Sequence, residues 1–421
     1  MNTRIDLSRF YLLEKGKLAR TFIFLGCLLA YLCSIHPWFL WPLEGIYVIP
    51  VALLLISAVL LSNTMEEPIF RDSGYFTPLM VYVMVSFYMC WSIGMTLSRL
   101  ISVIFSIIIF YVLLRIQPKD FDWLLTLICK SMAVLLGVSV FFFLLHLVGF
   151  PLPSRQSTFG EQQYNFDNYF FFMIANDREM INIIPRFSSV FLEPGHLGTA
   201  ASLLIMTQMG RWNRWYNIVL WFATVLTFSL AAYAFLTALI FFNLWVQRKR
   251  VVGKAILAIV FIASVVGASF VYNGGDNLFH DLILLRLEVD DRTGEMTGNN
   301  RVSEDFQMTY DKYISTPDVI LGRSFAEEDI GYGNSGYRVF VFEHGLVGTL
   351  LTFIFYFLVF RQFRDPRCLI AAVVIALLNF WIRGYPWWYS NILPFMALIY
   401  TDRFLPLKES GLLINQEVSD E

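Results

Sequence analysis

One short stretch of the chain gathers residue types that could bind a phosphate group and move a proton. Pro194 fits the first turn of a helix, where its missing N–H costs nothing. Free backbone N–H groups at such a helix start, next to glycines, bind phosphate, and a nearby arginine adds a bidentate donor. The stretch therefore predicts either a phosphate-binding helix start or simply a well-capped helix. It consists of Arg186, Glu193, Pro194, Gly195, His196 and Gly198.

Two of these side chains could act as a general base. A carboxylate or imidazole that takes the proton of an attacking hydroxyl contributes ~10²–10⁴ in rate. We expect Glu193 in this role, with His196 as its substitute. Each also has a structural interpretation, because a carboxylate favours the positive end of a helix and a histidine packs well at a membrane interface.

The composition points to a membrane protein as the setting for this chemistry. Of 421 residues, 57% are apolar and 15% charged, with 41 Phe, 20 Tyr and 11 Trp, whereas a soluble domain is about half apolar and a quarter charged. Lys plus Arg (31) nearly balance Asp plus Glu (33), which argues against a nucleic-acid binder. The five cysteines lie in apolar runs, so we expect neither disulfides nor a metal site.

Hydropathy predicts an all-α polytopic membrane protein with about twelve transmembrane helices, since about 20 apolar residues cross a bilayer. The stretch from 215 to 247 is almost unbroken, and its length alone requires a turn near Ser229. The expected spans are 20–37, 45–62, 76–94, 99–116, 123–149, 194–209, 215–229, 230–247, 252–272, 339–360, 368–383 and 388–401.

The distribution of Lys and Arg orients these spans. Basic residues recur in alternate short loops, so the positive-inside rule places both termini in the cytoplasm. Two long periplasmic segments containing short helices then face outward. The parts we expect are a five-helix membrane part at 1–150, a first periplasmic segment at 151–192, central membrane helices at 193–272, a large periplasmic loop at 273–338, and C-terminal helices with a cytoplasmic tail at 339–421.

This topology adds candidate substrate-binding residues at the outer face of the membrane. Arg338 and Arg383 are expected at the outer ends of two late helices, where each could bind substrate or simply reach lipid headgroups. The run Phe170 to Phe172 predicts a piece of the first outer segment that turns back against the membrane. Trp387, Trp388 and Tyr389 are typical of an interfacial belt, and they could also stack on sugar rings.

Four motifs, in order, resemble the superfamily of O-antigen polymerases (Wzy-like) and O-antigen ligases. The first runs from Arg186 to Glu193-Pro194, and the second, Thr227-Phe228-Ser229, is similar to a Thr-x-Ser turn between two helices. The third is Asn299-Asn300-Arg301, and the fourth, Glu343 to Gly348, is similar to a Glu-x-Gly-x-x-Gly helix entry. The resemblance covers about residues 180 to 350.

The resemblance implies a polysaccharide polymerase in the bacterial inner membrane. Its donor would be an oligosaccharide linked to undecaprenyl pyrophosphate, transferred at the periplasmic face without metal or cofactor, and a chain-length regulator would be a partner. Arg186 and Arg301 would converge to stabilise the diphosphate, since fixed donors best stabilise such a charge. Ligases carry a histidine nine residues before the Glu of the helix entry, where this chain has Asn334. Asn334 is therefore a candidate for substrate binding.

Three alternatives stay open at this level. An O-antigen ligase would perform the same chemistry on a different acceptor. A polysaccharide flippase or transporter usually shows two related halves and charges along a central pathway, whereas here the charge concentrates in one outer loop. A membrane anchor or receptor would leave Arg186 and Arg301 dispensable.

Overall fold

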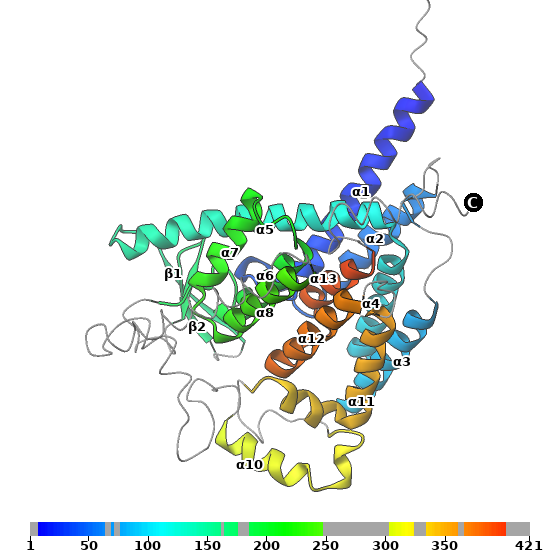
Figure 1. Cartoon of the computed structure of the whole chain (residues 1–421), viewed down its shortest axis with the longest axis vertical. Coiled ribbons are helices and arrows are strands. Elements are labelled where there is room, and N and C mark those ends of the chain that lie inside the picture. The colour runs from blue at the N-terminus through cyan, green and yellow to red at the C-terminus, as the bar shows by residue number, and fades with distance from the viewer. Residues whose placement is uncertain are drawn as a thin grey trace, which may run out of the picture.

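The computed structural model describes residues 7–63, 69–70, 76–160, 164–175, 185–246, 303–323, 334–360 and 366–400, and it is mostly helical (Figure 1). The helices are α1 (Leu7–Cys33), α2 (Val48–Ser62), α3 (Phe76–Ser92), α4 (Leu97–Arg115), α5 (Pro118–Leu147), α6 (Pro194–Thr207), α7 (Trp215–Leu226), α8 (Leu230–Val246), α10 (Glu304–Tyr313), α11 (Tyr337–Phe360), α12 (Pro366–Arg383) and α13 (Tyr389–Tyr400), with short 3₁₀ turns η1 (Trp38–Leu43) and η5 (Pro317–Val319).

The apolar helices indicate a membrane protein. Five stretches are long and apolar enough to cross a bilayer: Lys15–Cys33, Leu97–Arg115, Pro118–Leu147, Tyr337–Phe360 and Pro366–Arg383. Shorter apolar helices, among them α2, α3, α7 and α8, complete the bundle. A helix lies at each expected span except the one at 252–272, which falls outside the described residues.

The turn expected near Ser229 is confirmed. α7 ends at Leu226 and α8 begins at Leu230, so the long apolar stretch is two helices. Phe228 has a φ of 45°, a left-handed conformation that a continuous helix does not contain. The Thr227 hydroxyl donates to the Thr224 carbonyl at 2.7 Å, which satisfies one of the carbonyl groups left open at the end of α7.

The expectation of a purely α-helical fold is wrong for part of the expected first periplasmic segment. Residues 155–160 and 164–175 contain a three-stranded antiparallel sheet with the order β1 (Arg155–Phe159), β2 (Tyr164–Asn168) and β3 (Met173–Ala175). The strands are short and polar, but alternate residues such as Phe166 and Met173 point to one side and pack with Leu192 and Trp41. A buried apolar face with a period of two stabilises strands and not a helix.

The aromatic run that follows β2 packs against α5, and its expected contact with the membrane stays a prediction. Phe171 stacks on Phe142 of α5 with ring centroids 4.3 Å apart, and Phe172 is fully buried against Phe143. Phe170 stays 42% exposed. These contacts attach the sheet to one end of α5.

α6 is the central helix of the bundle (Figure 1). It packs against α5, α7, α8 and α13, and every residue from Gly195 to Thr207 is buried. A helix that is buried on all sides must carry small or apolar residues at each contact. Gly198 meets this need, because a Cβ there would lie 2.7 Å from the Cβ of Ala232 on α8.

Candidate functional site

The segment that leads into α6 is fixed from several directions. The Met173 N–H donates to the Ser189 carbonyl at 2.9 Å, and the Trp38 N–H donates to the Val190 carbonyl at 3.0 Å. The Phe187 N–H donates to the Leu226 carbonyl at 3.2 Å. Phe187 and Phe191 are fully buried. These contacts with β3, η1 and α7 fix the position of Glu193, the next polar residue along the chain.

Glu193 begins α6. Its backbone is extended, with φ −137° and ψ 140°, and Pro194 occupies the first helical position. Its side chain makes no capping hydrogen bond to the helix backbone, although its negative charge still lies at the positive end of the helix dipole. The carboxylate is 26% exposed and lies 3.6 Å from Nε2 of His196.

The residue that faces Glu193 is Arg383, the last residue of α12. Its Nη1 lies 3.7 Å from Oε2 of Glu193, and its Nε donates to Oγ1 of Thr199 at 3.3 Å. The side chain is only 7% exposed. A buried charge costs several kcal/mol unless it is paired and hydrogen-bonded, so Glu193 and Thr199 make this position tenable.

Gly195 is required by the approach of Arg383. A Cβ on Gly195 would collide with Nη2 and Cζ of the Arg383 guanidinium. The guanidinium therefore lies directly on the first turn of α6. Gly195 thus serves this site through its lack of a side chain, in the way that glycines permit close approach.

Aromatic rings close the site on one side. Tyr385 and Trp388, in the turn between α12 and α13, stack in parallel with centroids 4.3 Å apart. The His196 ring meets Trp388 edge-on at 4.9 Å and is 9% exposed. A cavity of about 10 Å³ lies among His196, Thr199, Arg383 and these two rings, which is about the space that one water needs.

His36, between α1 and η1, also belongs to this site, and sequence reasoning missed it. Its ring lies 5.4 Å from the Trp388 ring and 6.3 Å from that of His196, and Nδ1 lies 3.4 Å from Oε1 of Glu44. Burial lowers the pKa of His36 to about 4, although the negative charge of Glu193 opposes this shift. Burial also raises the pKa of Glu44. The available signal was the position of His36 at the end of the first expected span.

Arg186 and Gly198 lie at a second place, the turn between α7 and α8. Nε of Arg186 donates to the Thr227 carbonyl at 3.3 Å, and the guanidinium is half-buried. A Cβ on Gly198 would lie 3.1 Å from Oγ1 of Thr227. The structure thus joins the first and second family-like motifs.

Arg338 and Asn334 lie at a third place, beside α10. Nη1 of Arg338 donates to Oε1 of Gln307 at 2.6 Å, and its guanidinium lies over the Tyr337 ring at 5.8 Å. Oδ1 of Asn334 accepts the backbone N–H of Ser303 at 2.7 Å. Both side chains therefore hold α10 in place. Asn299, Asn300 and Arg301 lie outside the described residues, so the expected convergence of Arg186 and Arg301 stays a prediction.

The cluster of Glu193, His196 and Arg383, which we call the α6 site, combines the elements that transfer from a phosphate leaving group needs. Arg383 offers a fixed guanidinium whose Nε–H donates to Thr199, while Nη1 faces Glu193 and Nη2 lies against Gly195. Such preorganised donors stabilise developing negative charge. Glu193 and His196 offer two proton acceptors beside it. Comparison of the chain with family models, with curated proteins and with solved structures finds no match.

Proposed function

We propose that this chain is a membrane polymerase of a surface polysaccharide. It transfers a glycan from undecaprenyl pyrophosphate onto a lipid-linked repeat unit at the periplasmic face of the inner membrane, with both chain termini in the cytoplasm. The observation that carries the proposal is the buried guanidinium of Arg383, set against Glu193 on the first turn of α6.

The positive charge at this site supports a diphosphate as the ligand. Arg383 lies within a bundle of apolar helices, where a fixed positive charge acts in a low dielectric and is worth more than in water. The N-terminus of α6 adds backbone N–H groups and the positive end of the helix dipole. Arg186 and Arg301 remain further candidates for the same diphosphate, on the motifs alone.

The proposed reaction needs a base and a cation, and no metal. A hydroxyl oxygen of the acceptor sugar attacks the anomeric carbon of the donor, and the bond from that carbon to the diphosphate oxygen breaks. Glu193 takes the hydroxyl proton, and Arg383 stabilises the charge that remains on undecaprenyl pyrophosphate. His196, 3.6 Å from Glu193, holds the carboxylate in position for this step.

The test is complementation of a strain that lacks the gene. The wild-type gene restores a ladder of long glycan chains, whereas Glu193→Gln yields acceptor with a single repeat unit at equal membrane abundance. Glu304→Gln is the matched control, because Glu304 is an exposed carboxylate in the first turn of α10. Full chains from Glu193→Gln, or the loss of all attached glycan in the deletion strain, would contradict the proposal.

Purified protein gives the biochemical version of this test. With a lipid-linked repeat as the sole substrate, wild-type protein forms polymer, and EDTA leaves the rate unchanged. Polymer formation that stops with EDTA and returns with a divalent cation would overturn the metal-free mechanism.

A further inference from the structure

A second, much larger cavity adjoins the α6 site. It has a volume of about 500 Å³ and lies between α3, α4, α11 and the turn before α13, within the range of ~300–1,000 Å³ that is usual for small-molecule sites. Tyr385 and Trp388 line both this cavity and the small one beside Arg383. One stacked pair of rings therefore forms the partition between the two spaces.

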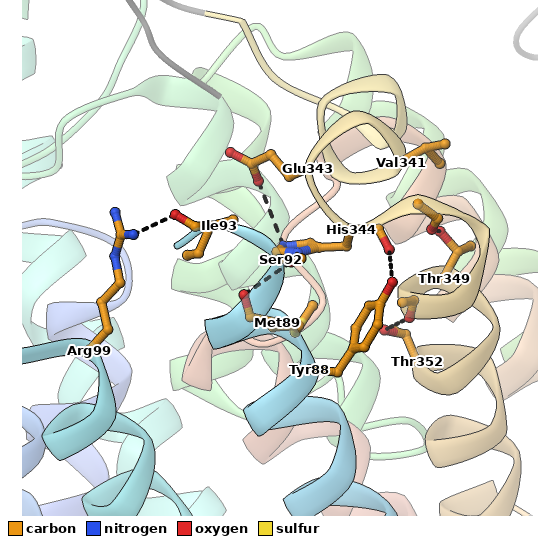
Figure 2. A network of polar contacts seen from close by, with 12 residues as sticks. Tyr88, Met89, Ser92, Ile93, Arg99, Val341, Glu343, His344, Thr349 and Thr352 are labelled. Carbon is orange, nitrogen blue, oxygen red and sulfur yellow. Dashed lines mark hydrogen bonds and ion pairs between the residues drawn. The ribbon is translucent and has the colours of Figure 1, made fainter. Parts of the chain in front are cut away.

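α3 and α11, which form one wall of the cavity, are joined by polar contacts (Figure 2). Nδ1 of His344 lies 2.7 Å from Oγ of Ser92, and its Nε2 lies 3.7 Å from Oε2 of Glu343. The Tyr88 hydroxyl approaches the His344 carbonyl at 3.2 Å. Glu343 and His344 both line the cavity, so a carboxylate and an imidazole face its interior from the same turn of α11.

The backbone of α11 is bent at this point. Gly345 has a φ of 63° and a ψ of −171° inside the helix, a conformation that only glycine adopts readily. Segment 320–323 fits into the bend, where the Val347 N–H donates to the Ile320 carbonyl at 3.0 Å. The bend thus joins the outer segment to the helix that carries Glu343 and His344.

The wall formed by α4 carries hydroxyl groups. Ser98, Ser102 and Ser106 recur every four residues, which places them on one face of the helix, and all three line the cavity. Ile101 and Ile104 of the same helix are 39% and 46% exposed. This largely apolar helix therefore presents three hydroxyl groups to the cavity, next to Arg99, which also lines it.

The floor of the cavity is aromatic. Tyr47, Tyr82, Trp387 and Trp388 line it. Aromatic rings of this kind offer flat apolar surfaces against which a ligand can pack.

We propose that this cavity binds the sugar residues of the acceptor, next to the donor diphosphate at the α6 site. A sugar ring has apolar C–H faces that pack on aromatic rings, and its hydroxyl groups pair with serine and carboxylate groups. A prenyl or acyl chain would bring only hydrocarbon to these polar side chains. This assignment rests on the proposed function, because it names the second substrate of the same reaction.

The rings shared by the two cavities would bring the acceptor close to the donor. Glycosyl transfer requires the acceptor oxygen to come within ~3–3.5 Å of the donor carbon. An acceptor that stacks on Trp388 from the cavity lies against the ring whose other contacts include His196, 4.9 Å away. The acceptor hydroxyl would then reach the Glu193 and His196 pair around the edge of this ring.

The test places a larger side chain on the face of α4 that lines the cavity and measures glycan binding directly. The full chain in lipid nanodiscs is titrated with the free oligosaccharide released by mild acid from the lipid-linked glycan of the producing cells, and binding is followed by tryptophan fluorescence. Ser102→Phe should weaken binding at least 10-fold, whereas Ile104→Phe, which places the same aromatic side chain on the exposed face of the same helix, should leave it unchanged.

Parallel titrations separate this inference from the proposed function. Ser102→Phe should still bind undecaprenyl pyrophosphate as wild type does, which shows that its fold is intact. Glycan binding that is equal in Ser102→Phe and wild type, absent from wild type, or displaced by undecaprenyl phosphate would overturn the assignment. Glycan binding that depends on Ser102 in a protein that forms no polymer would support the cavity assignment and contradict the polymerase.

Discussion

The α6 site and the α10 cluster (Ser303, Gln307, Asn334 and Arg338) both contain an arginine that the sequence places at the outer end of a late helix. At the α6 site, Arg383 is 7% exposed and faces the Glu193 carboxylate. In the α10 cluster, Arg338 is half-buried and donates to the amide oxygen of Gln307. The first arginine lies inside the bundle against a charged partner, and the second attaches a short helix to α11.

The difference shows that the partner and the burial, more than the residue type, separate a candidate site from a structural contact. A buried ion pair is weak evidence for stability, because desolvation offsets much of the attraction. Its presence beside a helix start and two cavities is therefore better explained by a ligand than by folding. Arg338, which donates to Gln307 and lies over the Tyr337 ring, connects α10 to α11.

Removal of the two guanidinium groups should give the largest contrast. Arg383→Ala should lower the rate of chain extension by at least ~10²-fold, the usual cost of one fixed donor to a developing charge. Arg338→Ala should change the rate less than about 3-fold. The measurement is polymer formed per minute by purified protein at matched concentration. Equal rates for the two variants would erase the distinction between the sites.

A smaller effect is expected when the guanidinium is displaced but not removed. Gly195→Ala places a methyl group where Nη2 and Cζ of Arg383 lie, so chain extension should fall by about 10-fold or more as Arg383 moves away from Glu193. Gly137→Ala is the control, because a Cβ there lies 3.7 Å from Val219, an ordinary contact. If both variants extend chains at the wild-type rate, Arg383 does not act from its observed position.

The stability of wild-type protein should fall at acidic pH because His36 is buried, and His36→Gln should lose less. Burial holds the pKa of His36 at about 4 in the folded protein, against about 6.5 in the unfolded chain. The unfolded state therefore binds more protons between these values, and stability falls as pH drops below about 6.5, by ~2 kcal/mol at pH 5. Thermal unfolding in detergent should show this loss in wild type and a smaller loss in His36→Gln. An identical pH profile for both proteins would contradict the buried, neutral state of His36.

The smallest expected effect is a local loss of stability when a residue of the α10 cluster is changed. Oγ of Ser303 accepts the Phe306 N–H at 3.1 Å as the N-cap of α10. Ser303→Ala should loosen α10 by ~1 kcal/mol and leave chain extension unchanged. Hydrogen exchange of residues 304–313 measures the first effect. A loss of activity that accompanies faster exchange would mean that α10 takes part in the reaction.

Features with a local cause could be predicted from the sequence. The apolar runs fix where the helices lie, and the length of the run from 215 to 247 requires the break that the structure places at 227–229. Pro194 marks the first position of α6. Each of these follows from the chain within one or two helical turns, where hydropathy and proline geometry act.

Features that depend on distant neighbours could not be predicted in this way. From the sequence, Arg338 and Arg383 are equivalent candidates. In the structure α13 packs on α6, and the end of α12 lies at Gly195. His36 joins the site because α1 packs on α13. Periodicity within a helix carries no information on which helix lies beside it, so the choice of arginine required the tertiary structure.

The most direct test of the central claim is equilibrium binding of undecaprenyl pyrophosphate to the full chain in nanodiscs. The account predicts that Arg383→Ala weakens this binding at least 10-fold, while Arg338→Ala binds as wild type does. Wild-type affinity in Arg383→Ala, with the loss in Arg338→Ala instead, would contradict the assignment of the diphosphate to the α6 site.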